Sequence, residues 1–270
     1  QFLALIARAN VTMVVPSKSV QENLVRLDAR FRKASFATIP HGYGQELKRI
    51  EVSTPSTRER FRILVLGQVS VAKGLELLRG SLAALTEFAE VYLLGCKELG
   101  EYFKFKTGVY VSENYEINEL PKHVAAINPH VGLLMSVVPE TFSYALTELL
   151  MLGVPPVVTK VGSFPERVRH GTNGYLYEPN SASLVATMKG INDDRQLLEA
   201  IRCNLQGWMP DSAEGMVTNY HRIVPIEGHS SGLERLEQNM QKEQPSASTA
   251  ADQVQLTQSL TISSMWKEIK

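Results

Sequence analysis

The sequence has few cysteines and no excess of charge of either sign. Among its 270 residues only Cys96 and Cys203 are cysteines, too few and too far apart for a disulfide framework or a zinc site. We expect both to be small buried hydrophobic residues in a reducing compartment. Lys and Arg together number 28, as do Asp and Glu, so no net positive field exists to attract nucleic acid. Nucleic acid is therefore not an expected partner.

Long hydrophobic runs and common metal-binding patterns are also missing. No run of eighteen apolar residues occurs, so no transmembrane helix is predicted. No Asp-x-Asp is present to hold a magnesium-bound diphosphate, and the six histidines lack metal-ligand spacing. We expect no metal and no cofactor, and we place most histidines at the surface or at helix ends. The chain opens without methionine or a signal pattern, so we expect it to begin inside a longer polypeptide.

Apolar runs of strand length alternate with apolar residues at helical spacing along most of the chain. Apolar residues make up 44% and charged residues 21%, as is typical of a folded globular protein. Alternation of strand and helix predicts an α/β fold with a Rossmann-like, doubly wound parallel sheet. The expected strands are 11–15, 36–39, 62–66, 89–94, 109–111, 131–135 and 156–159. The expected helices are 20–31, 75–85, 119–127, 142–152, 183–188, 195–208 and 212–223.

Composition divides the chain into four parts. A polar stretch at 51–60 indicates a linker between the end of one domain at 1–50 and a second domain at 61–228. Residues 229–270 are rich in Ser, Thr and Gln and bury too little to offset chain entropy. We therefore expect that segment to be a flexible polar tail.

The loop after the strand at 62–66 contains a candidate phosphate ligand. In open parallel sheets, ligands bind outside the carboxyl ends of the strands. This loop runs from Gly67 and Gln68 to Lys73 and Gly74, which places a lysine between a strand and the next helix. Such a lysine can face a phosphate. The alternative is an ordinary surface lysine.

A second loop carries two glutamates around a helix start. Glu140 precedes the helix expected at 142–152, and Glu148 lies within it. Eight residues of helix rise about 12 Å and bring the two positions within about 80° of each other, so the carboxylates could hold separate parts of one extended ligand. The free amides around Ser143 and Tyr144 would form an anion site of the kind that accepts diphosphate. The alternative is a pair of solvated or capping glutamates.

Two further motifs have structural explanations. Gly42-Tyr43-Gly44 lacks a third glycine and a following helix, so we interpret it as a hinge turn rather than a dinucleotide site. Ser163, Pro165 and Glu166 fit a helix start in which the serine caps and the glutamate completes a capping box.

Taken together, these motifs resemble the retaining glycosyltransferases of family 4, which have the two-domain GT-B fold. The resemblance covers about residues 10 to 223 and looks most like bacterial enzymes of surface-polysaccharide synthesis. It rests on Val15-Pro16-Ser17, Ile39-Pro40-His41-Gly42, Gly67 to Gly74, Asn128-Pro129-His130, Pro139 to Glu148, Gly153-Val154-Pro155, Val161 to Glu166 and Gly171 to Leu176. It implies that 61–228 is the donor-binding C-terminal half of the fold. Residues 1–50 would be the end of a mostly missing acceptor-side half.

The resemblance also implies roles for individual residues. Lys73 would bind the diphosphate, Glu140 the hydroxyls of the donor sugar and Glu148 the ribose hydroxyls, with Lys73 and Glu140 as the catalytic pair. The donor-binding set is completed by Gly67, Gln68, Thr141, Phe142, Ser143 and Tyr144.

The sequence departs from the family at two of these positions. The family usually has arginine where Gln68 stands, so one cation beside the leaving diphosphate is absent. It usually has glycine where Ser143 stands, and the serine Cβ narrows the pocket formed by the amides.

The function implied is transfer of a sugar from a nucleoside diphosphate sugar to a glycan or lipid-linked acceptor with retention. The resemblance places the enzyme in the cytoplasm at the inner face of the plasma membrane, with peripheral membrane contact through the missing half. The present chain alone is expected to be inactive. Two alternatives stay open, a nucleotide-sugar 2-epimerase of the same architecture and a non-catalytic nucleotide-sugar-binding or scaffold domain.

Overall fold

The structure of the chain is a computed structural model that describes residues 11–44, 47 and 59–224. Most of the expected linker, at 51–58, and the whole expected tail at 229–270 lie outside the described residues. The chain falls into two compact units divided between Tyr220 and His221, and the second unit is described only at 221–224. Nearly all of the described residues therefore belong to the first unit.

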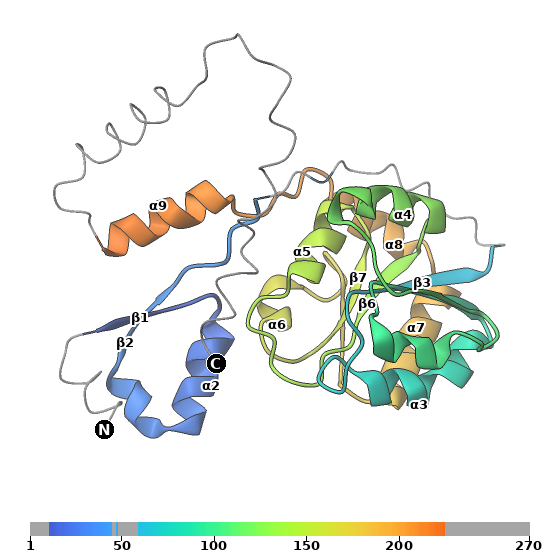
Figure 1. Cartoon of the computed structure of the whole chain (residues 1–270), viewed down its shortest axis with the longest axis horizontal. Coiled ribbons are helices and arrows are strands. Elements are labelled where there is room, and N and C mark those ends of the chain that lie inside the picture. Colours follow the sequence, from blue (N-terminus) through green and yellow to red (C-terminus); the bar gives the residue numbers. More distant parts are fainter. Residues whose placement is uncertain (1–10, 45–46, 48–58, 225–270) are drawn as a thin grey trace, which may run out of the picture. The chain divides into compact units, whose positions relative to one another are not determined.

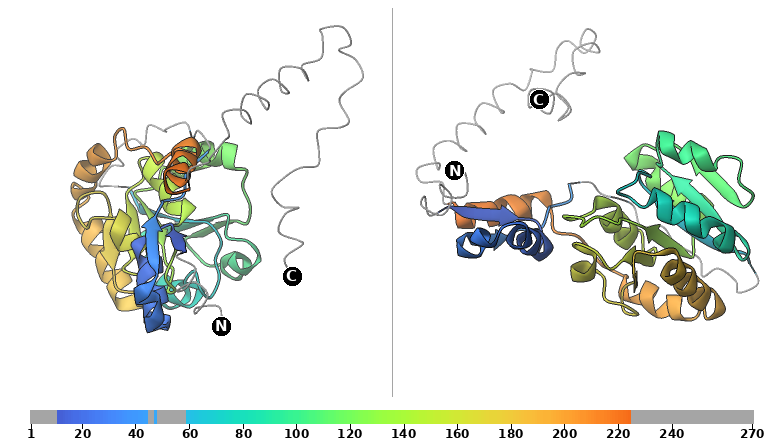
Figure 2. Two further views of the ribbon diagram at one scale, coloured as in Figure 1. Left: turned by 90° about the vertical axis from the view of Figure 1, so that its left-hand side faces the viewer. Right: turned by 90° about the horizontal axis from the view of Figure 1, so that it is seen from below.

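A small parallel sheet forms near the start of the described chain. Strand β1 (Thr12–Val15) pairs with β2 (Ser35–Thr38) in parallel register. Helix α2 (Lys18–Leu27) and the short 3₁₀ helix η1 (Ala29–Lys33) connect the two strands, and Figure 2 shows α2 beside them. A parallel pair needs a long crossover connection, and residues 16–34 provide it here mainly as helix.

The main body contains a six-stranded parallel sheet in the order β5-β4-β3-β6-β7-β8. The chain adds strands outward from β3 to β5 and then returns to place β6 on the other side of β3, as in doubly wound folds. The predicted fold class is therefore confirmed, and the direction of winding reverses between β3 and β6. The strands are β3 (Phe61–Leu66), β4 (Ala89–Leu94), β5 (Val109–Ser112), β6 (Val131–Leu134), β7 (Pro156–Thr159) and β8 (Tyr175–Tyr177).

Helices cover both faces of this sheet. Helices α3 and α7 pack side by side on one face, and α4 and α5 lie on the other (Figure 1). No described helix is long and apolar enough to cross a membrane. The helices are α3 (Leu75–Thr86), η2 (Glu98–Phe103), η3 (Ile117–Glu119), α4 (Leu120–Ile127), α5 (Tyr144–Met151), α6 (Phe164–Arg167), α7 (Ser181–Asp193), α8 (Leu197–Asn204) and α9 (Ala213–Ile223).

Burial explains the strand sequences and corrects one expectation. Every residue of β6 and β7 is buried, which is why these strands read as continuous apolar runs. Cys96 is buried as expected, but the prediction for Cys203 is wrong, because this residue is exposed. Helix α8 directs Leu198 and Ile201 into the core, and Cys203 falls on its outer face.

Candidate functional site

Two loops meet at the carboxyl ends of β3 and β6, where the winding of the sheet reverses. The backbone amide of Val137 donates to the carbonyl oxygen of Ala72 at 3.0 Å, which joins the two loops. Gly74 ends the first loop with a φ of +86°, and a Cβ there would overlap the Met135 carbonyl oxygen. Glycine is therefore required for the loops to approach this closely.

The predicted catalytic pair forms an ion pair across these loops. Lys73 Nζ contacts Glu140 Oε1, which also accepts a hydrogen bond from Ser136 Oγ. The lysine side chain is 44% exposed and the glutamate 11%, so the cation faces solvent above a nearly buried carboxylate. A small cavity of about 80 Å³ opens beside them, and its lining includes Gly67, Gln68, Lys73, Ser136, Glu140 and Ser143.

The loop after β7 fixes the backbone of Glu140. The amide of Ser163 donates to the Glu140 carbonyl oxygen at 2.9 Å. Gly162 has a φ of +64°, and a Cβ at this position would overlap the Glu140 backbone. The position of the carboxylate therefore depends on a loop more than twenty residues further along the chain.

The amino end of α5 lies beside the same cavity. Ser143 caps the helix, because its Oγ accepts from the Leu146 amide at 3.3 Å, and it has a φ of +70°. The amides of Ser143, Tyr144 and Ala145 donate to no acceptor within the described part of the chain. The helix starts at Tyr144 rather than at the predicted residue 142, since the positive φ of Ser143 interrupts the helical backbone.

Glu148 lies apart from the small cavity. It is 8% exposed, and its carboxyl interacts with the phenols of Tyr43 and Tyr115. Burial raises the pKa of Glu148, and the two phenols partly offset that rise. The buried Tyr43 hydroxyl has no hydrogen-bond partner of normal geometry among the described residues, and its interaction with Glu148 is electrostatic.

The helical spacing predicted for the two glutamates is wrong. Residues 140–143 are not helical, so the calculated rise and rotation do not apply between Glu140 and Glu148. The two carboxylates still belong to one loop and the helix that follows it.

A larger cavity of about 280 Å³ lies against Phe142. Its lining includes His41, Phe142, Glu166, Arg167 and Trp208. The ring of His41 meets Phe142 edge-on at 5.3 Å and stacks on Tyr144 at 6.0 Å, measured between ring centroids. His41 and the Tyr43 of the predicted hinge turn at 42–44 are thus both at the site, since the Tyr43 ring also lies 6.2 Å from that of Tyr144.

The predicted capping box at Ser163 and Glu166 is wrong. Ser163 makes no side-chain cap bond, and its buried Oγ has no partner in the described part of the chain. The Glu166 carboxylate instead accepts from the backbone amides of Lys18 at 2.9 Å and Ser19 at 2.7 Å, at the start of α2. Helix α2 begins at Lys18, two residues before the predicted start at residue 20, and Ser17 is its N-cap.

The structure brings together only part of the predicted donor-binding set. Gly67, Gln68, Lys73, Glu140 and Ser143 line one cavity. Phe142 is buried and lines the larger cavity, and Thr141 and Tyr144 are exposed. Glu148 is buried and interacts with two tyrosines. Sequence reasoning missed Ser136, Tyr115 and Arg167, because nothing in their local pattern distinguishes them from ordinary polar or aromatic residues.

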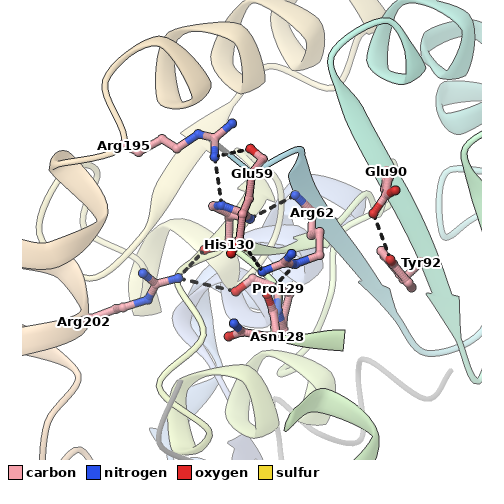
Figure 3. Close-up of polar contacts among 9 residues, drawn as sticks. All are labelled: Glu59, Arg62, Glu90, Tyr92, Asn128, Pro129, His130, Arg195 and Arg202. Atoms are coloured by element: carbon pink, nitrogen blue, oxygen red, sulfur yellow. Dashed lines mark hydrogen bonds and ion pairs between the residues drawn. The ribbon is translucent and has the colours of Figure 1, made fainter. Parts of the chain in front are cut away.

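A second polar cluster lies at the opposite, amino end of β6. His130 is fully buried, although we placed most histidines at the surface or at helix ends. Its Nδ1 accepts from the Arg62 amide at 3.0 Å, and its Nε2 lies 3.1 Å from Arg195 Nη1. Figure 3 shows Arg62, Arg195 and Arg202 around the ring. Burial, with these three arginines, lowers the pKa of His130 to about 3, so the ring is neutral.

Among the described residues, no three His, Cys, Asp or Glu side chains gather in a group that could hold a metal ion. The polar groups available at the carboxyl ends of the strands are instead an ammonium, a carboxylate and unpaired backbone amides. Such a combination can bind an anion next to hydroxyl groups.

Comparison with known families identifies the chain. Residues 60–194, half of its length, match the family model described as Glycosyl transferases group 1. The chain belongs to this family. The matched region of this group 1 glycosyltransferase domain contains both loops, Lys73 and the two glutamates. A comparison with curated proteins gives no match.

Solved structures similar to this glycosyltransferase domain share its fold at low identity. Sucrose-phosphate synthase from Thermosynechococcus elongatus has a TM-score of 0.62 and 17% identity over 78% of this chain and 57% of its own. HepE of Anabaena, solved with UDP and glucose, has a TM-score of 0.62 and 19% identity over 79% and 62%. The lipopolysaccharide outer core galactosyltransferase WaaB has a TM-score of 0.58 and 17% identity over 78% and 60%. The chain therefore spans only about three fifths of these proteins.

Proposed function

We propose that this chain is the donor-binding part of a retaining glycosyltransferase of family 4. The enzyme would move a sugar from a nucleoside diphosphate sugar to a glycan or lipid-linked acceptor. The observation that carries the proposal is the pairing of Lys73 with Glu140 beside the unpaired amides at the start of α5. Family membership and the likeness to HepE, solved with UDP and glucose, support it.

Each group has a task in the proposed reaction. Negative charge grows on the diphosphate as the sugar becomes oxocarbenium-like, so a cation and fixed amides stabilise the transition state more than the ground state. Lys73 and the amides of Ser143 and Tyr144 would take the diphosphate, and Glu140 would accept from hydroxyls of the sugar. Donor binding would then replace the ion pair that Lys73 makes with Glu140.

Glu148 would accept hydrogen bonds from the ribose hydroxyls. It is buried between Tyr43 and Tyr115, so ribose can reach it only if one phenol gives way. We further propose that transfer needs no metal or cofactor, since the cationic and amide groups can neutralise the diphosphate.

The biological setting is proposed on narrower grounds. WaaB is a galactosyltransferase of the lipopolysaccharide outer core, and the likeness of the two folds supports a role in surface polysaccharide synthesis. We place the enzyme in the cytoplasm at the inner face of the plasma membrane, where a lipid-linked acceptor would be available.

Calorimetry on the 270-residue chain with UDP and with uridine tests the assigned site. We expect Lys73→Ala to weaken UDP binding at least tenfold, a loss of about 1.4 kcal/mol, and to leave uridine binding nearly unchanged. Glu148→Gln should weaken both ligands, because both contain the ribose. Lys122→Ala removes an exposed lysine on α4 and is the matched control.

Unchanged UDP affinity in the Lys73 variant would remove that residue from the site. Transfer itself is tested on the whole protein, with the anomeric configuration of the product read by NMR. A nucleoside diphosphate sugar that binds but is transferred to no acceptor would favour the non-catalytic alternative, and donor epimerised without acceptor would favour the 2-epimerase.

A further inference from the structure

Arg167, at the end of α6, is hydrogen-bonded to the loop that leads into α5. Its Nη1 donates to the carbonyl oxygens of Phe142 at 2.6 Å and Ser143 at 2.9 Å. Its Nη2 donates to Thr147 Oγ1 at 2.8 Å, and its guanidinium carbon lies 4.1 Å from the Phe142 ring centroid. One planar group therefore holds two successive carbonyls, an aromatic ring and the first turn of the helix.

These contacts fix a backbone conformation that a serine does not favour. Ser143 has a φ of +70°, in a region that side chains with a Cβ rarely adopt. The two carbonyls belong to the peptide planes on either side of the Ser143 Cα, and the orientations of these planes determine its φ and ψ. Arg167 Nη1 thus bonds to both planes, and the Ser143 carbonyl oxygen also accepts from the Thr147 amide at 3.4 Å and from Thr147 Oγ1 at 3.5 Å. Within the described residues, Arg167 gives the one hydrogen bond to the Phe142 carbonyl oxygen.

The same geometry decides where the amides point. In a trans peptide the N–H lies opposite the C=O. Because the carbonyls of Phe142 and Ser143 face Arg167, the amides of Ser143 and Tyr144 face away from it. Arg167 and Phe142 line the larger cavity, whereas Ser143 lines the smaller cavity that contains Lys73. The amides are therefore directed to the side of the loop opposite the guanidinium.

We propose that Arg167 is a positioning residue that sets affinity for the diphosphate by holding the Ser143 and Tyr144 amides in place. The inference rests on the proposed function, since it assigns a task within the same site. Three of the five N–H groups of Arg167 donate on the far side of the loop, so the proposed role is to position the amides rather than to bind the anion directly. Burial lowers the pKa of Arg167 to about 10, so the side chain stays cationic at neutral pH.

The test compares UDP with uridine, which lacks the phosphates, by calorimetry on the 270-residue chain. We expect Arg167→Met to weaken UDP binding at least tenfold and uridine binding less than twofold. Arg167→Lys should lose nearly as much UDP affinity, because one ammonium cannot reproduce the planar fork. Thr147→Val is the matched control, since it removes the contacts of Thr147 Oγ1 with Arg167 and with the Ser143 carbonyl oxygen but leaves both bonds from Arg167 to the carbonyls. It should change UDP affinity less than threefold.

A second substitution, at Ser143, gives the most specific test of the positioning role. Glycine adopts a positive φ at little cost, so adding Ser143→Gly to Arg167→Met should restore at least threefold of the lost UDP affinity. The single Ser143→Gly variant is the reference for that comparison. A merely structural role for Arg167 would weaken UDP and uridine equally and would give no rescue by glycine.

The outcomes separate this inference from the proposed function. If Lys73→Ala weakens UDP binding and Arg167→Met does not, the positioning role is wrong and the site stands. If Lys73→Ala leaves UDP binding unchanged, the assigned diphosphate site is wrong, and the inference about Arg167 is wrong with it. Should Arg167→Met fail to fold, Arg167→Lys with and without Ser143→Gly makes the same comparison.

Discussion

At His130, burial decides the protonation state of a histidine. The ring is fully buried among three arginines, and its pKa is lowered to about 3. An unfolded chain has a histidine pKa of about 6.5. Above pH 6.5 the ring is neutral in both states, whereas below it the unfolded state binds a proton that the folded state excludes. The free energy of unfolding therefore decreases as the pH falls from 6.5 towards 3.

We predict that this residue alone removes about 2 kcal/mol of stability between pH 7.5 and pH 5. Urea unfolding at the two pH values measures the loss, with His130→Asn as the comparison. Asparagine can still accept from the Arg62 amide but does not titrate in this range. A variant with the same pH dependence as the wild type would show that other groups carry the effect.

Residues of the site could be predicted from the sequence where a side chain able to bind the ligand lies in a loop that directly follows a strand. Lys73 and Glu140 follow the two strands where the winding reverses, and a parallel sheet brings those positions together. Arg167 belongs to α6 and Tyr115 to another loop, and their contacts with the site arise only from tertiary packing. No local pattern in the sequence indicates either residue.

At the scale of elements, the strands were predictable and the loop conformations were not. The predicted strand at 62–66 is β3 with one residue added, and the strand at 156–159 is β7 as found. Buried parallel strands read as short apolar runs, which explains this agreement. The start of α5 was misplaced because Ser143 adopts a positive φ that its residue type does not indicate.

The join between the two site loops gives a prediction for the glycine that ends the first loop. Gly74→Ala should destabilise the protein by more than about 2 kcal/mol, because the new Cβ adds an unfavourable positive φ to a clash with the Met135 carbonyl. Denaturant unfolding measures the change in the free energy of unfolding.

Gly190→Ala is the matched control, since this residue lies within α7 with open space around its Cβ position. It should stabilise by about 0.5–1 kcal/mol. Equal effects at the two glycines would contradict the assigned role of the loop contact.

On the scale of the whole molecule, helix α2 is capped by a residue far along the chain. Ser17 provides no side-chain cap, and Glu166 accepts from the amides of Lys18 and Ser19. A charged cap of this kind contributes about 1–2 kcal/mol. We therefore predict that Glu166→Ala speeds hydrogen exchange of the α2 amides about tenfold and leaves the amides of β3 and β6 unchanged.

Mass spectrometry after timed deuteration measures this difference. Glu76→Ala, which removes an exposed glutamate paired with Arg79 on α3, is the control and should leave α2 unchanged. Uniform acceleration across the sheet would instead mean that Glu166 acts on global stability.

The reversal of winding between β3 and β6 has a mechanical consequence. Lys73 continues the half of the sheet that runs from β3 to β5, and Glu140 continues the half from β6 to β8. A ligand bound by both side chains would contact both halves of the sheet at the same edge. It would therefore oppose relative movement of the β3–β5 half and the β6–β8 half. Partial unfolding of either half would then release the molecule, so a bound ligand makes the two halves unfold as one.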